Sequence, residues 1–124
     1  MKTRKALIVD DFLSIRTVMK SILIRDNIDV TTAENGKAAL AFTENETFDI
    51  IISDLDMPIM DGLTFFKELR KDTKHLSTPL IILTTNAANQ ERHKKDIEQI
   101  NLFAWIIKPF DFLDFRNIVN KALK

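Results

Sequence analysis

Carboxylates follow two apolar runs of this sequence, at the points where predicted strands end. Asp54 comes directly after residues 50–53, and the pair Asp10 and Asp11 comes directly after residues 6–9. If the strands run parallel, their carboxyl ends meet along one edge of a single sheet, where open α/β sheets place their ligand sites. The sequence therefore predicts an acidic cluster at that edge.

Two further apolar runs end in a hydroxyl group and in a cation. Residues 80–83 are followed by Thr84, and residues 103–107 are followed by Lys108. On a parallel sheet, these two side chains arrive at the same edge as the aspartates. The edge then holds a hydroxyl donor and a positive charge, both of which can bind phosphoryl oxygens.

The acidic cluster indicates which metal ion it would bind. Three neighbouring carboxylates repel one another and raise each other's pKa values unless a cation lies among them. Oxygen ligands without a nearby histidine or thiolate select Mg²⁺ or a similar hard ion, which keeps coordination positions that a phosphate can fill. The pattern predicts phosphoryl chemistry, with Asp54 as a nucleophile that forms an acyl phosphate. The two histidines, His75 and His93, stand in polar surroundings and are expected to be solvated.

Length and composition fit one small domain that covers residues 1–124. The 124 residues are 45% hydrophobic and 29% charged, enough for one core and too few for a second domain. Basic and acidic residues balance at 18 each, so no general attraction to nucleic acid or to an anionic membrane is expected. The lack of cysteine excludes disulfides and zinc–sulfur sites. The first apolar run is too short for an export signal or a membrane span, so a soluble, cytoplasmic protein is expected.

The elements that position these groups alternate between strand and helix patterns along the whole chain. This alternation predicts a parallel sheet with crossover helices, an α/β fold. Residues 48–53 and 80–83 are nearly continuous apolar runs, typical of central strands buried on both faces. Residues 28–32 alternate apolar and polar side chains, which favours an edge strand.

Five helices are expected between and after the strands. The first spans about residues 12–26, the second about 38–46, the third follows Gly62, and the fifth begins at an N-cap, Asp111. Helical spacing predicts core-facing side chains at Phe12, Ile15, Val18, Met19, Ile22 and Leu23 in the first helix, and at Phe112, Phe115, Val119 and Ala122 in the fifth.

The fourth helix, residues 89–100, is polar along most of its length. Only Ile97 and Ile100 are strongly apolar, so little burial holds this helix in place. Two interpretations stay open: an element of low stability that moves in a switch, or a solvated surface helix without a role.

Taken together, these motifs resemble the receiver domain of two-component response regulators over essentially all 124 residues. The matching segments are residues 9–11, 53–62, 83–84 and 107–110. The resemblance implies a flavodoxin-like (βα)₅ doubly wound sheet in the order 2-1-3-4-5. It also implies Mg²⁺-dependent phosphorylation of Asp54 by a sensor histidine kinase, in a protein that promotes its own phosphorylation and dephosphorylation without being a turnover enzyme.

The resemblance also implies roles for the site residues. Asp11 and Asp54 would bind the metal through their side chains, Asp10 would act mainly through water, and Asp56 would offer its backbone carbonyl. Lys108 would hold a phosphoryl oxygen, with a cis bond between it and Pro109.

A conformational switch is implied as well. Thr84 would swing toward the phosphoryl group and Trp105 would turn inward behind it, which changes the face of the fourth helix, the fifth strand and the fifth helix for a downstream partner. Asp56, Thr85 and Asn86 would modulate the reaction, and a phosphatase is a further possible partner.

Several alternatives stay open at this level. Thr84, Thr85 and residues 104–110 look most like free-standing chemotaxis-type receivers, but a receiver excised from a larger regulator, or a phosphorelay intermediate, would look the same. A haloacid-dehalogenase-type phosphatase also uses two strand-end aspartates, which would be Asp54 and Asp56, although Pro58 stands where that family favours threonine. A pseudo-receiver would lack part of the acidic set, which is intact here.

Overall fold

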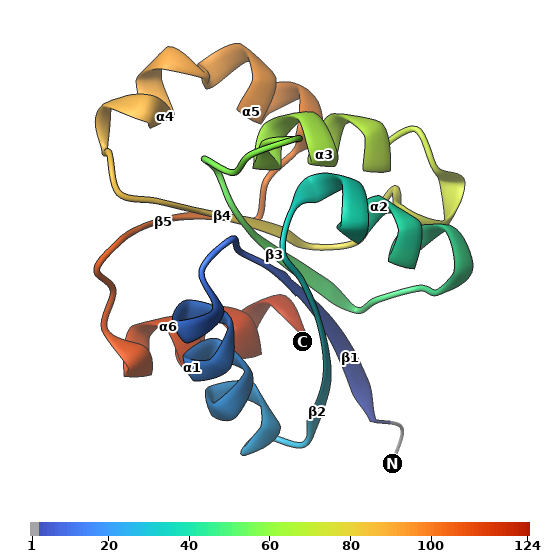
Figure 1. The fold of residues 1–124 in the computed structure, drawn as a ribbon, viewed down its shortest axis with the longest axis vertical. Helices are drawn as coiled ribbons and strands as arrows, with labels where there is room; N and C mark the ends of the chain where they lie inside the picture. Colours follow the sequence, from blue (N-terminus) through green and yellow to red (C-terminus); the bar gives the residue numbers. More distant parts are fainter. Residues whose placement is uncertain (1–2) are drawn as a thin grey trace.

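One parallel sheet runs through the computed structural model, which describes residues 3–124 (Figure 1). Neighbouring strands all pair in parallel, in the order β2-β1-β3-β4-β5, so the predicted α/β fold and strand order are confirmed. The strands are β1 (Arg4–Val9), β2 (Ile28–Ala33), β3 (Ile50–Asp54), β4 (Leu80–Thr84) and β5 (Ala104–Ile107).

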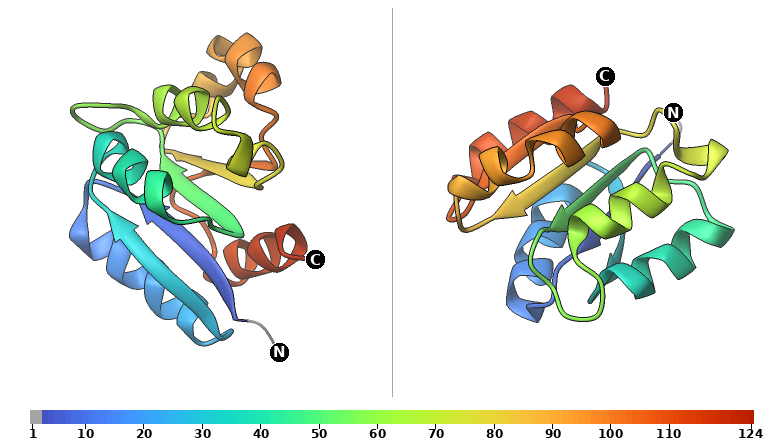
Figure 2. Two further views of the ribbon diagram at one scale, coloured as in Figure 1. Left: turned by 90° about the vertical axis from the view of Figure 1, so that its right-hand side faces the viewer. Right: turned by 90° about the horizontal axis from the view of Figure 1, so that it is seen from above.

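Helices cover both faces of this sheet, as both views in Figure 2 show. The helices are α1 (Leu13–Ile24), α2 (Gly36–Asn45), α3 (Gly62–Leu69), α4 (Ala88–Arg92), α5 (Lys94–Ile100) and α6 (Phe112–Ala122), with a 3₁₀ turn η1 (Thr73–His75) before β4. Helices α1 and α6 pack on one face, and α2, α3 and α5 pack on the other, each over its own hydrophobic cluster. No helix between residues 3 and 124 is long and apolar enough to cross a membrane.

Burial along the strands follows the sequence pattern. Every residue of β3 and of β4 is buried, as expected for central strands. Strand β2 lies at one edge and alternates buried with more exposed residues. Asp111 caps α6 as predicted, because its carboxylate accepts hydrogen bonds from the backbone N–H groups of Leu113 and Asp114 at 2.8 and 3.1 Å.

Three residues of the predicted helical stripes face solvent instead of the core. Phe12 is 61% exposed because it is the N-cap of α1, where the backbone is extended and the helical period does not yet apply. Val18 is also exposed, whereas Met19 and Leu23 fill the core as expected. Phe112 is exposed because Phe110, from the preceding loop, stacks against the buried Phe115 and fills that space.

The predicted fourth helix, residues 89–100, is two helices in the structure. The chain leaves helical geometry at His93, where φ is −105° and ψ is 20°, so α4 ends at Arg92 and α5 begins at Lys94. The charged residues on both sides of the break are exposed, so they bury little surface that would hold one straight helix in place. The two short helices are therefore free to be fixed by different partners.

One predicted surface residue, His75, is completely buried. Its ring lies at the end of η1, with Nδ1 3.6 Å from a carboxylate oxygen of Asp72. Burial lowers the pKa of His75, so the ring is neutral at physiological pH even though the Asp72 charge works in the opposite direction. His93, the second histidine, is half-buried at the junction of α4 and α5.

Candidate functional site

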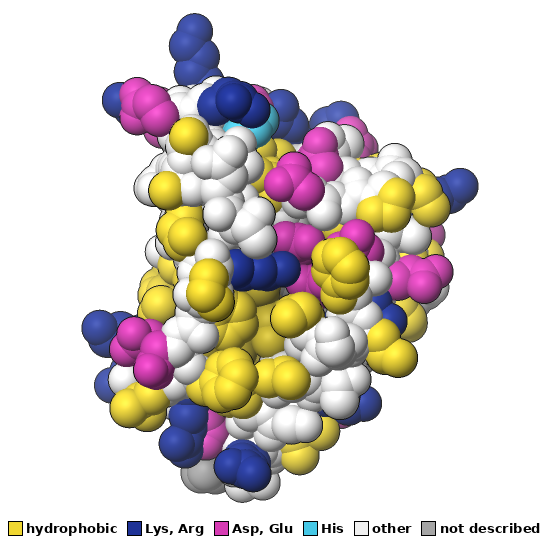
Figure 3. Space-filling view, turned by 60° about the vertical axis from the view of Figure 1, so that its left-hand side comes forward, with side chains coloured by type: hydrophobic (Ala, Val, Ile, Leu, Met, Phe, Trp, Pro, Cys, Tyr) yellow, Lys and Arg dark blue, Asp and Glu magenta, His cyan; other side chains and the backbone are white. Residues whose placement is uncertain are grey.

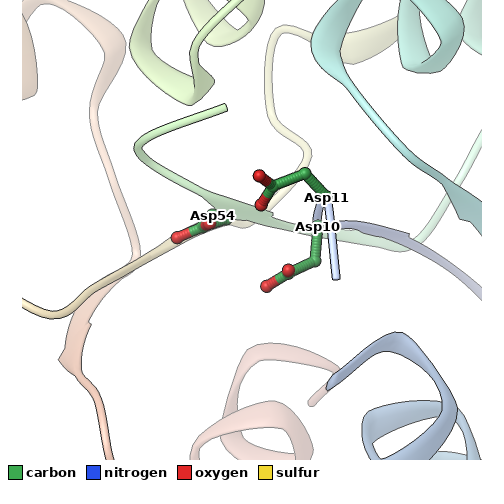
Figure 4. A group of neighbouring side chains, drawn as sticks. All are labelled: Asp10, Asp11 and Asp54. Carbon is green, nitrogen blue, oxygen red and sulfur yellow. The ribbon is translucent and has the colours of Figure 1, made fainter. Parts of the chain in front are cut away.

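Three aspartates meet at the carboxyl edge of the sheet (Figure 4). Asp10 and Asp11 follow β1, and Asp54 is the last residue of β3. Val9 pairs with Ser53, so the two strands end side by side. One oxygen of each aspartate lies within 4.8 Å of the others, which confirms the predicted acidic cluster.

Lys108 brings the single ammonium group that contacts this cluster among the described residues. Its Nζ lies 2.9 Å from Asp10 Oδ2 and 3.3 Å from Asp54 Oδ1. The backbone N–H of Lys108 donates to the Thr84 carbonyl at 2.7 Å, which aligns the end of β5 with β4, and the bond to Pro109 is cis as expected. Figure 3 shows basic and acidic side chains meeting in the middle of one face, with hydrophobic side chains around them.

The electrostatics of the cluster raise the pKa of Asp54 above its ordinary value. Burial raises the pKa of Asp54 to about 6, because removing a carboxylate from water penalises its charged form. Lys108 works to lower this pKa, while the charges of Asp10 and Asp11 raise it further. Burial also works to lower the pKa of Lys108, but its hydrogen bond to Asp10 and the charges of Asp10 and Asp54 outweigh burial and raise it.

Some carboxylate oxygens of the cluster accept hydrogen bonds, and at least one has no partner among the described residues. Both oxygens of Asp10 are bonded, since Oδ1 accepts from the Phe12 N–H at 2.9 Å and Oδ2 accepts from Lys108. Asp11 Oδ1, by contrast, is shielded from solvent and finds no hydrogen-bond partner within residues 3–124. An unpaired, shielded carboxylate oxygen beside two other carboxylates fits a hard divalent cation such as Mg²⁺.

Gly62 lets helix α3 approach Asp54 closely. Its N–H donates to the Leu55 carbonyl at 2.9 Å, and a side-chain carbon at position 62 would collide with the backbone oxygen of Asp54. The Asp61 carboxylate caps the same helix by accepting from the Thr64 N–H at 2.8 Å. These contacts hold the loop after β3 and with it the position of Asp54.

Thr84, at the end of β4, is fully buried and its hydroxyl is bonded on the side of α4. Its Oγ1 accepts hydrogen bonds from the Asn86 N–H at 3.2 Å and from the side-chain amide of Asn89 at 3.3 Å. Sequence reasoning did not single out Asn89, because one asparagine in a polar helical stretch carries no distinguishing signal. It is nevertheless a residue that touches the candidate site.

Among the described residues, the other predicted site residues form no hydrogen bond with the three aspartates or with Lys108. Asp56, Thr85 and Asn86 are exposed just after β3 and β4. Trp105 lies on β5 beside Ile82 of β4 and is partly buried. Its indole N–H is shielded from solvent and has no hydrogen-bond partner among the described residues.

Comparison with known proteins gives one consistent match. The model of the response regulator receiver domain family matches residues 6–120. The chain is 34% identical over 116 residues to the DNA-binding transcriptional regulator NtrC of Salmonella typhimurium, which covers 94% of this chain but spans only 24% of NtrC. It is 32% identical over 120 residues to the chemotaxis protein CheY of Bacillus subtilis, which covers 96% of this chain and 97% of CheY.

Solved structures agree with this match. The structure of the chemotaxis response regulator CheY4 of Vibrio cholerae is similar with a TM-score of 0.90 and 34% sequence identity, covering 98% of this chain and all of CheY4. The sheet order and the acidic edge described above thus occur in a chain whose fold is that of CheY4 throughout.

Proposed function

Because this chain belongs to the response regulator receiver family, a family of signalling proteins, we propose that it accepts a phosphoryl group on Asp54 from a sensor histidine kinase. The reaction depends on Mg²⁺, and the phosphorylated form controls a downstream protein. One observation carries the proposal: Asp54 is buried at a strand end between a lysine ammonium and two further carboxylates, one of which has an unpaired oxygen.

The chain's own groups suit each part of the transfer. A carboxylate oxygen of Asp54 attacks phosphorus, a new oxygen–phosphorus bond forms, and the bond from phosphorus to the kinase histidine nitrogen breaks, leaving its electron pair on the imidazole. Lys108 Nζ, already 3.3 Å from Asp54, is within reach of a phosphoryl oxygen there. Thr84 supplies a hydroxyl donor from the neighbouring strand.

Mg²⁺, when bound, neutralises charge on the phosphoryl oxygens. Asp11 and Asp54 would hold it directly, since Asp11 Oδ1 is unpaired, whereas Asp10, whose two oxygens are bonded, would act through water. Asp56 would add its backbone carbonyl. Because the pKa of Asp54 is raised, a bound cation would also favour the ionised carboxylate, which is the form that attacks phosphorus.

Phosphorylation then changes the face built by α4, α5, β5 and α6. Thr84 and Trp105 are the switch residues of the proposal, and Asp56, Thr85 and Asn86 tune access to the phosphoryl group and its hydrolysis. A partner protein distinguishes the two states at this face, and a phosphatase is a further partner.

Two assemblies fit this function. Similarity along nearly the whole length of CheY supports a free-standing, chemotaxis-type regulator acting in the cytoplasm. Similarity to a quarter of NtrC supports a second candidate, a receiver unit of a larger regulator or phosphorelay. Because the chain belongs to the receiver family, there is no separate reason to interpret Asp54 and Asp56 as the catalytic aspartates of a haloacid-dehalogenase-type phosphatase.

Acetyl phosphate with Mg²⁺ tests the phosphoacceptor without a kinase. Intact-protein mass spectrometry should find one added phosphoryl group on the wild type and none on Asp54→Asn, because an amide cannot form the acyl phosphate. Asp29→Asn, an exposed change on edge strand β2, should be phosphorylated like the wild type. Equal modification of Asp54→Asn under the same conditions would show that the nucleophile is misassigned.

A further inference from the structure

Helix α4 is joined to the sheet through the side chain of Asn89. Asn89 is 6% exposed, whereas the other four residues of α4 face solvent. Its side-chain amide donates to Thr84 Oγ1 at 3.3 Å. Within residues 3–124, this is the one hydrogen bond that joins α4 to the sheet. The position of α4 therefore depends on a residue of the phosphorylation site.

Helix α5, on the other side of the break at His93, is fixed independently of that site. Lys67 of α3 pairs with Asp96 at 2.8 Å, and Arg70 Nε donates to the carbonyl of Ile100 at 2.8 Å. The side chain of Ile100 is also 1% exposed in the core. Because the two helices are joined at a residue that has already left helical geometry, α4 can move while α5 stays in place.

We propose that Asn89 is a positioning residue that couples the Thr84 hydroxyl to the position of α4. This inference rests on the proposed function, in which Thr84 turns toward a phosphoryl oxygen. When the hydroxyl turns, the buried amide of Asn89 loses its acceptor, and a buried donor without a partner is unfavourable. Moving α4 outward returns that amide to water, and among residues 3–124 no other hydrogen bond between α4 and the sheet opposes the movement.

The same hydrogen bond also sets the resting equilibrium. It stabilises the unphosphorylated arrangement, in which Thr84 is bonded toward α4. Removing it favours the arrangement that a phosphoryl group selects, so a phosphoryl mimic should bind more tightly to the altered protein. A net contribution typical of one protein hydrogen bond corresponds to about a three- to tenfold gain in affinity.

The first experiment needs no phosphoryl group. Amide hydrogen exchange of the metal-free protein, followed by NMR, should be faster in residues 88–93 of Asn89→Ala and of Thr84→Val, with unchanged exchange in α5. The double variant should exchange like Thr84→Val alone, because Thr84→Val already removes the bond from Asn89, together with the one from the Asn86 N–H. Gln90→Ala is the matched control, because it also introduces alanine on α4 but at an exposed position.

The second experiment measures the affinity of beryllofluoride, a phosphoryl mimic, in the presence of Mg²⁺. Asn89→Ala should bind it about three- to tenfold more tightly than the wild type, Gln90→Ala should not, and Asn89→Ala should have no effect in a Thr84→Val background. If the wild type binds beryllofluoride and Asn89→Ala matches Gln90→Ala in both affinity and exchange, the coupling by Asn89 is overturned and the proposed function stands. If the wild type does not bind the mimic on Asp54, the proposed function fails, and the exchange experiment still decides whether Asn89 holds α4.

Discussion

Two polar clusters lie at opposite ends of the same strands. At the amino ends of β4 and β5, the Arg70 guanidinium donates to the carbonyls of His75, Ile100 and Asn101 at 2.6, 2.8 and 3.3 Å. At the carboxyl edge, one lysine pairs with Asp10 and Asp54, and a shielded oxygen of the third aspartate, Asp11, has no partner among the described residues. In the first cluster the guanidinium is paired with three carbonyls, and the second cluster holds three carboxylates against one ammonium.

The two clusters differ in how a polar group affects the stability of the fold. A charged group whose hydrogen bonds are complete adds stability, and removing it leaves its partners unsatisfied. A crowded group whose charge is uncompensated costs stability until a ligand arrives, and removing it relieves the repulsion. Substitutions at the two clusters should therefore change stability in opposite directions.

The largest effect is expected at Arg70. Arg70→Ala should lower the free energy of unfolding by about 2–4 kcal/mol, because three carbonyls lose a charged donor. Arg70→Lys should recover little of this loss, since an ammonium cannot reproduce the fork of a guanidinium. Urea denaturation measures the change, while acetyl phosphate should still phosphorylate the folded variant.

Arg116 supplies the control for Arg70. It forms a bidentate pair with Asp26, at 2.6 and 2.7 Å, but on the exposed surface, where such pairs add little. Arg116→Ala should lose much less stability than Arg70→Ala. Equal losses of stability would show that the hydrogen bonds of Arg70 contribute no more than an exposed ion pair.

The next effect has the opposite sign and concerns Asp54. Its pKa is raised from 3.8 to about 6, so the folded state holds a proton that the unfolded state releases. The stability that this carboxyl contributes is complete below pH 3.8 and is lost as pH rises through 6. Without metal, Asp54→Asn should be more stable than the wild type at pH 8, by at most about 2–3 kcal/mol, with no such gain near pH 4.

Denaturation in EDTA across this pH range tests the sign. Asp29→Asn, on the exposed part of β2, should show no gain at either pH. A constant difference between Asp54→Asn and wild type from pH 4 to pH 8 would mean that repulsion in the cluster does not destabilise the fold.

A smaller effect is expected from Mg²⁺ itself. Binding to the folded protein should raise the wild-type free energy of unfolding by about 1.4 kcal/mol at ten times Kd. Asp11→Asn should weaken Mg²⁺ binding at least about tenfold because it removes the charge of a free ligand oxygen, whereas a folded Arg70→Lys should bind Mg²⁺ as the wild type does. Titration calorimetry distinguishes them, and equal weakening by both changes would place the ion elsewhere.

The smallest signal comes from Trp105, the one tryptophan of the chain. Its fluorescence should change when Mg²⁺ binds and again when beryllofluoride binds, because Trp105 lies on β5 three residues before Lys108 and its partly buried ring packs against the core. Thr84→Ala should keep the first change and weaken the second. If the fluorescence of the wild type does not change when beryllofluoride is bound, Trp105 is not the switch residue.

The two clusters also differ in how far the sequence predicts them. The aspartates could be predicted because each follows an apolar run, and the parallel sheet then brings strand ends together. The Arg70 cluster could not, because its acceptors are backbone carbonyls 5, 30 and 31 residues away that leave no mark on the sequence. The burial of His75 and the bond from Asn89 were missed for the same reason: tertiary contacts decide both.

Gly62 lets α3 approach the end of β3, and this close approach restricts which residues can stand at position 62. Adding a single methyl group there would push on the backbone oxygen of Asp54, so even the mildest substitution displaces Asp54, the proposed phosphoacceptor. Ile59, three positions earlier in the loop before α3, is 76% exposed, so its side chain meets solvent and not Asp54, although its φ of 73° is unusual for a β-branched residue. Variation at exposed positions of this loop can therefore alter the surface that a partner meets, while Gly62, the first residue of α3, has almost no substitutes.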